Sequence, residues 1–132
     1  MTMKLIVLIF PIFLVGCLDS MEYVQLNNQT DIAVKIKKDN GEMVSISPNS
    51  KVDVPLNDLL TLKDKKNGFK ISIFAEGKWL NCYISLNNNE FRDRYLSAKI
   101  FDKDRYLFKY KSNELYIFDP KSLKDMHVID CT

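Results

Sequence analysis

The sequence predicts an all-β domain, a small antiparallel β-sandwich or barrel of about eight to ten short strands. Two observations predict it. Apolar and polar residues alternate with a period of two through most of the chain after residue 22, as in strands that bury one face. Turn-forming residues interrupt this alternation roughly every eight to twelve positions, and helical periodicity is almost absent.

The clearest local pattern is a hairpin over residues 32–46. Apolar side chains occupy every second position over 32–36, and the same face resumes over 44–46. Asn40-Gly41 lies between the two runs, and Asn-Gly between alternating runs is a strong signal for a tight hairpin turn.

Further strands follow from the same alternation. We expect them at 23–27, 52–54, 69–75, 79–86, 96–101, 105–111, 115–118 and 128–131. Two segments allow two interpretations each. Residues 56–62 fit either one helical turn capped by Asn57 or part of a strand, and residues 90–94 fit either a helical turn or a loop.

The first sixteen residues have the pattern of a secretory signal peptide. Lys4 precedes an apolar run over 5–15, broken only by Pro11, and the small residue Gly16 follows it. The run is shorter than the roughly 20 residues that a helix needs to span a bilayer. Export is therefore the expected outcome.

Leu14-Val15-Gly16-Cys17 resembles the lipobox of bacterial lipoproteins. The resemblance implies cleavage before Cys17, a diacylglycerol on its thiol and an acyl chain on the new amine, and several chains give stable anchoring. We therefore expect a signal peptide over 1–16, a lipidated tether over 17–22 and one domain over 23–132. Because Leu18, not Asp, follows the cysteine, the lipoprotein pattern favours the outer membrane, facing the periplasm.

Charge gives little support for nucleic acid as a partner. The chain has 19 Lys and Arg against 17 Asp and Glu, and loss of Lys4 leaves the mature part nearly neutral. The densest basic stretch, 63–66, contains an Asp and is typical of a solvated loop. Nucleic-acid binding depends on cations that displace counterions from phosphates.

Two cysteines remain once Cys17 carries lipid. In an exported protein, Cys82 and Cys131 are expected to form a disulfide, which would contribute about 4 kcal/mol on the chain-entropy model. The alternatives are two inert buried thiols or a metal site. With His127 as the only histidine and no Cys-x-x-Cys, a metal site has little support.

Catalytic motifs are missing from the sequence. It has no Gly-x-Ser-x-Gly, no His-Glu-x-x-His and no glycine-rich phosphate loop. Asp102 and Asp104 share a turn, but a calcium loop needs more oxygen ligands and a glycine. We expect neither an enzyme nor a bound cofactor.

Aromatic residues concentrate in the second half of the chain, where we expect them on three neighbouring strands. The set comprises Trp79, Tyr83, Tyr95, Phe101, Tyr106, Phe108 and Tyr110. One interpretation is ordinary packing in the core and across the sheet. The other is a protein-binding face formed by Trp79, Tyr83 and Tyr106, since interfaces favour Tyr and Trp.

Together these features favour a non-catalytic protein-binding or assembly module of the cell envelope, of the kind found in secretion machines. The alternative is an immunity or inhibitor lipoprotein that neutralises a periplasmic toxin or lysozyme. In both cases the partners expected are the membrane, through lipid on Cys17, and another protein.

Overall fold

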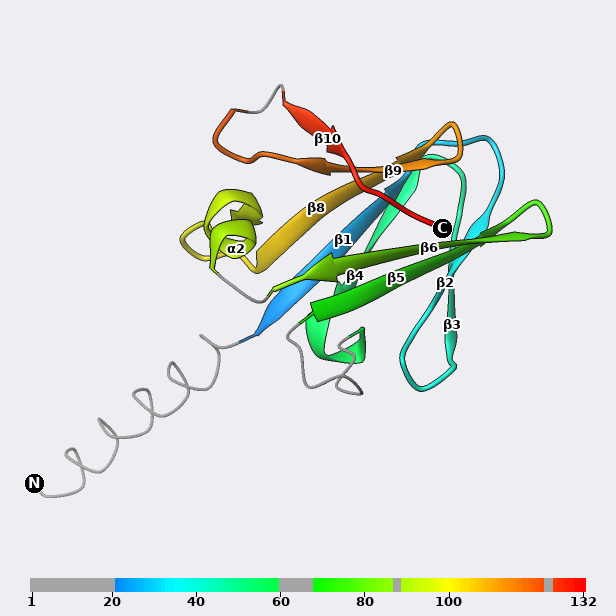
Figure 1. The fold of residues 1–132 in the computed structure, drawn as a ribbon, viewed down its shortest axis with the longest axis horizontal. Helices are drawn as coiled ribbons and strands as arrows, with labels where there is room; N and C mark the ends of the chain where they lie inside the picture. The colour runs from blue at the N-terminus through cyan, green and yellow to red at the C-terminus, as the bar shows by residue number, and fades with distance from the viewer. Residues whose placement is uncertain (1–20, 60–67, 87–88, 123–124) are drawn as a thin grey trace, which may run out of the picture.

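The computed structural model describes residues 21–59, 68–86, 89–122 and 125–132, and they form two β-sheets with one short α-helix (Figure 1). The expected signal peptide, the expected lipidation site Cys17 and the expected basic loop over 63–66 lie outside the described residues. Within the described part, no helix is long and apolar enough to cross a membrane.

The larger sheet has six strands in the order β10-β9-β8-β1-β4, with β7 also paired to β8. Its strands are β1 (Glu22–Asn28), β4 (Ser50–Pro55), β7 (Leu96–Ser97), β8 (Asp104–Lys111), β9 (Glu114–Phe118) and β10 (Met126–Val128). We call it sheet A.

The smaller sheet, sheet B, has four strands in the order β3-β2-β5-β6. They are β2 (Val34–Lys37), β3 (Met43–Ile46), β5 (Gly68–Ala75) and β6 (Lys78–Ser85). The predicted hairpin over 32–46 is confirmed from Val34 onward, with Val34 opposite Ile46 and Lys37 opposite Met43. Ile32 lies before β2 and is exposed, so the strand begins later than predicted. Both sheets are open within the described residues, so the prediction of a β domain holds and a barrel is not formed.

One strand pair departs from the antiparallel prediction. β1 and β8 lie side by side and parallel, with Glu22 opposite Asp104 and Asn28 opposite Tyr110. A parallel pair needs a long crossover between its strands. Here the chain builds β4, all of sheet B and the short helix before it returns as β8, and that path brings two distant segments together.

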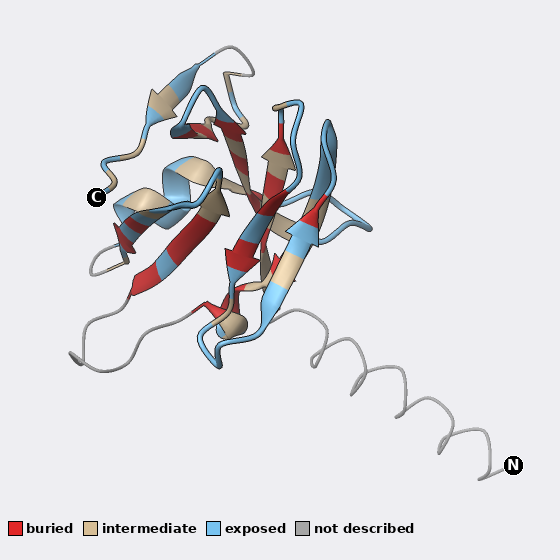
Figure 2. Cartoon of the chain, turned by 90° about the vertical axis from the view of Figure 1, so that its right-hand side faces the viewer, coloured by how far each residue is buried: buried red, intermediate tan, exposed pale blue. Residues whose placement is uncertain are grey.

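The core lies between the sheets, where the inward-facing side chains of both form one apolar cluster (Figure 2). Phe69 of β5 contacts Tyr106 and Phe108 of β8, with ring centroids 5.8 and 6.1 Å apart. These three are the largest fully buried side chains in the described part of the chain. Aromatic packing across the two sheets therefore dominates the core.

Both ambiguous segments contain short helices. Residues Leu56–Asp58 form a 3₁₀ turn, and Glu90–Tyr95 form the α-helix α2. Phe91 of α2 packs against the edge of the core, with its ring centroid 5.5 Å from that of Tyr106.

The predicted strand over 96–101 is wrong beyond its first two residues. Ser97 of β7 lies opposite Arg105, one residue after the start of β8 at Asp104. A strand that continued past Ala98 would have no partner there, and the chain turns away instead.

The predicted disulfide between Cys82 and Cys131 is confirmed. The final strand, β10, begins earlier than predicted, and Cys131 instead forms an isolated bridge to Cys82 beside β6. Asn81 and Thr132 exchange backbone hydrogen bonds of 2.9 and 2.8 Å. Because β10 belongs to sheet A and β6 to sheet B, the disulfide fastens one sheet to the other.

Asn28 makes a second connection between the sheets. Its side chain is fully buried, and its Nδ2 donates to the carbonyls of Ile32, Ile46 and Ser47 at 2.8, 3.1 and 3.2 Å. Its Oδ1 accepts from the Thr30 hydroxyl at 2.7 Å. The segment after Asn28 is thus a turn whose polar groups are satisfied, as buried polar groups must be.

Candidate functional site

The outward face of sheet B carries an unusual set of side chains. Alternation along β2, β5 and β6 turns every second residue away from the core, and these residues are basic, aromatic or small and polar. We call this surface the basic–aromatic face. It comprises Lys35, Lys37, Lys70, Ser72, Phe74, Trp79, Asn81 and Tyr83.

Trp79 is held at one end of the face by its neighbours. It lies opposite Phe74 across β5 and β6, with ring centroids 5.1 Å apart and a tilted arrangement. Lys37 of β2 places its Nζ 5.8 Å from the centre of the indole ring, within cation–π range. The indole is nevertheless 43% exposed, so one side of it is open to a partner.

Tyr83 lies at the other end of the face, opposite Lys70, and is 45% exposed. Its ring lies against Gly68 at the start of β5. A Cβ built on Gly68 would come within 2.6 Å of the Tyr83 hydroxyl oxygen, so the position has no room for a side chain. The lack of a side chain on Gly68 leaves room for the hydroxyl end of Tyr83.

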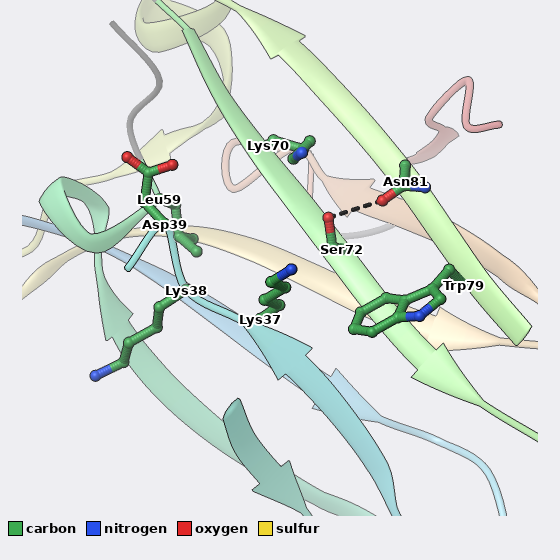
Figure 3. Close-up of a pocket in the computed structure, with 8 residues that line it drawn as sticks. All are labelled: Lys37, Lys38, Asp39, Leu59, Lys70, Ser72, Trp79 and Asn81. Carbon is green, nitrogen blue, oxygen red and sulfur yellow. Dashed lines mark hydrogen bonds between the residues drawn. The ribbon is translucent and has the colours of Figure 1, made fainter. Parts of the chain in front are cut away.

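Beside Trp79 is a shallow hollow of about 380 Å³, which residues of β2, β5 and β6 also line (Figure 3). Ser72 and Asn81 form its floor and are joined by a 2.8 Å hydrogen bond from the Ser72 hydroxyl to Asn81 Oδ1. Lys38 lines the rim, but its amine turns away from Trp79 and contacts Glu42 at 3.1 Å and Asp58 at 3.4 Å. Hydrogen bonds to Glu42 and then Asp58 raise the pKa of Lys38.

The strands of this face carry charge of one sign, whereas Asp39, which follows β2, adds a carboxylate to the lining of the hollow. The four strands of sheet B contain four lysines, Lys35, Lys37, Lys70 and Lys78, and no Asp or Glu. In the described part of the chain, none of the four is joined to a carboxylate by an ion pair. The face can therefore attract an anionic or acidic surface and stack aromatic side chains against it.

The structure brings two of the three predicted binding residues together. Trp79 and Tyr83 lie on the same face of β6, but Tyr106 is fully buried on the inner side of β8. The expectation that the aromatic strands are neighbours is wrong, because β6 belongs to sheet B and β8 to sheet A. Tyr106 packs in the core, and its pKa is raised, mainly because burial disfavours the phenolate.

The sequence alone does not identify the lysines of this face as part of a binding surface. They alternate with buried residues over 34–37, and Lys70 follows buried Phe69, so a period-two reading assigns them to the solvent side. What the sequence does not contain is the pairing of β2 with β5, which sets Lys35 and Lys37 opposite Phe74 and Ser72.

The carboxylate of Asp102, in the acidic turn before β8, is held by hydrogen bonds from its neighbours. Asp102 accepts hydrogen bonds from Arg105 Nη1 at 2.8 Å and from the backbone N–H of Lys103 at 2.7 Å. The first of these bonds, more than the second, lowers the pKa of Asp102. In the described part of the chain, no three Asp, Glu, His or Cys residues are grouped so that they could hold a metal ion.

Comparison of the chain with protein-family models, with curated proteins and with solved structures gives no match in any of the three.

Proposed function

We propose that this chain is a lipid-anchored protein of the bacterial envelope, facing the periplasm, that binds an acidic surface of a partner protein through the basic–aromatic face. It acts as a non-catalytic binding or assembly module. The observation that carries the proposal is the exposure of Trp79 and Tyr83 among lysines on a sheet face whose strands have no acidic residue.

The face combines the two features that a protein interface uses. Tyr and Trp supply large rigid contacts that dominate binding energy when a partner excludes water from them. Lysines of one sign attract an acidic partner over a distance and increase the rate of association. Trp79, Asn81 and Tyr83 occupy alternate positions on the outward side of β6, so a partner segment that runs along β6 would contact both rings.

Two further observations support the envelope as the site of action. The lipobox resemblance at Leu14-Val15-Gly16-Cys17 implies export and acylation. The Cys82–Cys131 disulfide fits an oxidising compartment, since disulfides persist there and are rare in the reducing cytosol. Export and oxidation are consistent with each other.

Site-directed photocrosslinking in intact cells tests the proposal. A benzophenone amino acid at position 83 would report on the basic–aromatic face, and one at Tyr116, on the outer side of sheet A, is the matched control. We expect a discrete adduct from position 83 that is absent from position 116. Equal labelling from both positions would contradict the proposal.

Charge reversal identifies the chemistry of the partner. Lys37→Glu with Lys70→Glu reverses two charges on the basic–aromatic face, and Lys51→Glu with Lys109→Glu does so on sheet A. If the partner surface is acidic, the first pair should abolish the position-83 adduct and the second should leave it. Retention of the adduct in the first pair would exclude an acidic partner.

A further inference from the structure

The turn between β7 and β8 presents two large apolar side chains to solvent. Ile100 is 85% exposed and Phe101 is fully exposed, whereas Val128, the next most exposed large apolar residue of the described chain, reaches 57%. We call these two residues the Ile100–Phe101 tip. Exposed apolar side chains that lie next to each other are typical of a surface that contacts a partner or a membrane.

The backbone at the tip strengthens this reading. Phe101 has a φ of +64°, in the left-handed region that bulky residues rarely adopt. The other non-glycine residues with positive φ in the described chain are polar: Asn49, Glu76, Ser112 and Asn113. Packing within the domain does not explain an exposed aromatic ring in a strained conformation, because the ring contacts none of the core aromatics.

The tip lies at the end of the molecule where the chain enters the domain. Asp104, three residues after Phe101, is paired with Glu22, the first residue of β1. Lys103 Nζ lies 4.6 Å from the centre of the Tyr23 ring, so the turn and the start of β1 are in contact. In Figure 1 the turn lies beside α2, on the side of the molecule where β1 begins.

Chain length then limits how far the tip can be from a lipid anchor. Glu22 follows Cys17 by five positions. Even a fully extended segment of that length spans only roughly 17 Å. A lipid on Cys17 therefore holds the start of β1, and the neighbouring tip, close to the membrane surface.

The charges around the tip fit a phospholipid surface. Lys99 and Lys103 flank the two apolar residues, and the carboxylate of Asp102 forms an ion pair with Arg105 at 2.8 Å. Apolar side chains bordered by lysines are typical of segments that lie in the membrane interface, where the rings enter the acyl boundary and the amines meet anionic headgroups.

We propose that the Ile100–Phe101 tip inserts into the bilayer that carries the Cys17 lipid and so sets the orientation of the domain. This inference rests on the proposed anchoring at Cys17. With the tip inserted, β1 and β8 lead away from the membrane, and the turn between β5 and β6, with Trp79 beside it, is held at the far side (Figure 1). The basic–aromatic face then stays open to its partner.

Depth-dependent fluorescence quenching tests the insertion. The acylated protein is purified from membranes and reconstituted into phosphatidylethanolamine–phosphatidylglycerol vesicles with brominated acyl chains. In a Trp79→Phe background, Phe101→Trp reports on the tip. Ile32→Trp is the control, because Ile32 is an exposed apolar residue beyond the opposite end of β1.

We expect the brominated lipid to quench the emission of the tip tryptophan by roughly twofold or more, and the control tryptophan hardly at all, because interfacial side chains reach the acyl boundary. Equal quenching at the two positions in acylated protein would overturn the insertion and leave the anchor standing. Mass spectrometry of the same protein tests the anchor itself, and a Cys17 without lipid would overturn both.

Trypsin gives a second readout that does not depend on a new tryptophan. In vesicles the inserted tip should shield the bonds after Lys99 and Lys103, and Phe101→Asn should increase cleavage there severalfold, whereas Ile32→Asn should not. Asn tolerates positive φ, so an unchanged melting temperature for Phe101→Asn would show that the fold is intact. Cleavage that Phe101→Asn leaves unchanged would contradict the insertion.

Discussion

The outer faces of the two sheets handle their charges in different ways. On sheet A, Arg105 of β8 pairs with Asp53 of β4 at 3.1 Å and with Asp102 at 2.8 Å, and Gln25 of β1 donates to the same Asp53. On sheet B, the lysines of the basic–aromatic face have no carboxylate partner in the described part of the chain. On sheet A the cation Arg105 is paired within the molecule, whereas Lys35, Lys37 and Lys70 of the basic–aromatic face have no ion pair in the described part of the chain.

This difference separates residues that hold the fold from residues that are available to a partner. The Arg105 and Asp53 side chains are only 19% and 22% exposed, so their pairing is partly shielded from water. Hydrogen bonds from Arg105 to Asp53 and then Asp102 raise the pKa of Arg105. Exposed lysines without an ion pair contribute little to folding, so the lysines of the basic–aromatic face are available to a partner.

The sharpest test compares a core aromatic with a face aromatic. Tyr106→Ala should lower the free energy of unfolding by about 3–5 kcal/mol, as buried aromatic truncations do, because Tyr106 packs against Phe69 and Phe91. Trp79→Ala should cost under about 1 kcal/mol of stability, the range of partly exposed contacts. Urea unfolding of both variants measures this, and equal losses would mean that Trp79 is structural.

The same Trp79→Ala variant should weaken partner binding by about 2 kcal/mol, the scale of an interface hot spot. Leu107→Ala, on the outer side of β8, is the matched apolar control, and we expect no change in binding from it. The partner that crosslinking identifies is titrated, uncrosslinked, against each purified variant to measure both binding constants. Undiminished binding by the Trp79 variant would place the interface elsewhere.

Removing the link between the sheets should have a comparable effect on stability. Replacing Cys82 and Cys131 with Ser, or reducing the disulfide, should lower the free energy of unfolding by about 4 kcal/mol, given a sequence separation of 49 residues. Urea unfolding of the oxidised and the reduced protein measures the loss, which should appear as a lower midpoint for the reduced protein. A midpoint that reduction does not move would show that the Asn81–Thr132 hydrogen bonds alone hold the C-terminal segment.

Replacing one cation on each face should have a smaller effect on the free energy of unfolding, and the effect should differ between the two faces. Arg105→Gln should cost about 1–3 kcal/mol, because it leaves the half-buried Asp53 without its cation. Lys70→Gln, on sheet B, should change stability by less than about 0.5 kcal/mol, as exposed substitutions do. Parallel denaturation curves decide this, and a costly Lys70→Gln would reveal a structural role for that lysine.

The sequence predicted local structure well and long-range pairing poorly. Alternation is a local property, so the hairpins over 34–46 and 68–85 and the inward position of Cys82 could be recognised directly. The parallel pairing of β1 with β8 could not be recognised. The two strands are about eighty residues apart, and no local pattern in either one indicates which strand it pairs with. For the same reason, the sequence did not predict that the lysines of β2 and β5 lie on one face.

The burial of Tyr106, which was predicted to lie in a binding face, agrees with the sequence pattern along β8. Along β8 the aromatic residues 106, 108 and 110 alternate with Arg105 and Lys109. Two charged residues on one side of a strand indicate that the other side is buried, and the burial of Tyr106 and Phe108 agrees with that rule. Along β6, by contrast, Trp79 and Tyr83 alternate with aliphatic residues and Cys82, so they face outward.

The last and smallest effect is the pH dependence of the sheet A network. Hydrogen bonds from Arg105, and then from the Lys103 N–H, lower the pKa of Asp102 in the folded state. The stability from this carboxylate is therefore fully present above its unfolded pKa, about 3.9. It is lost as pH falls through the lower folded value.

The difference in unfolding free energy between the wild type and Asp102→Asn should thus be constant near neutral pH and shrink below about pH 4. In an Arg105→Gln background the pH-dependent part of that difference should be greatly reduced, since the main cause of the pKa shift is gone. Because the Asp102 side chain is 47% exposed, water screens the pair and the effect stays small. Urea titrations across this pH range measure it. An identical pH profile in both backgrounds would mean that the Lys103 N–H, not Arg105, sets the ionisation of Asp102.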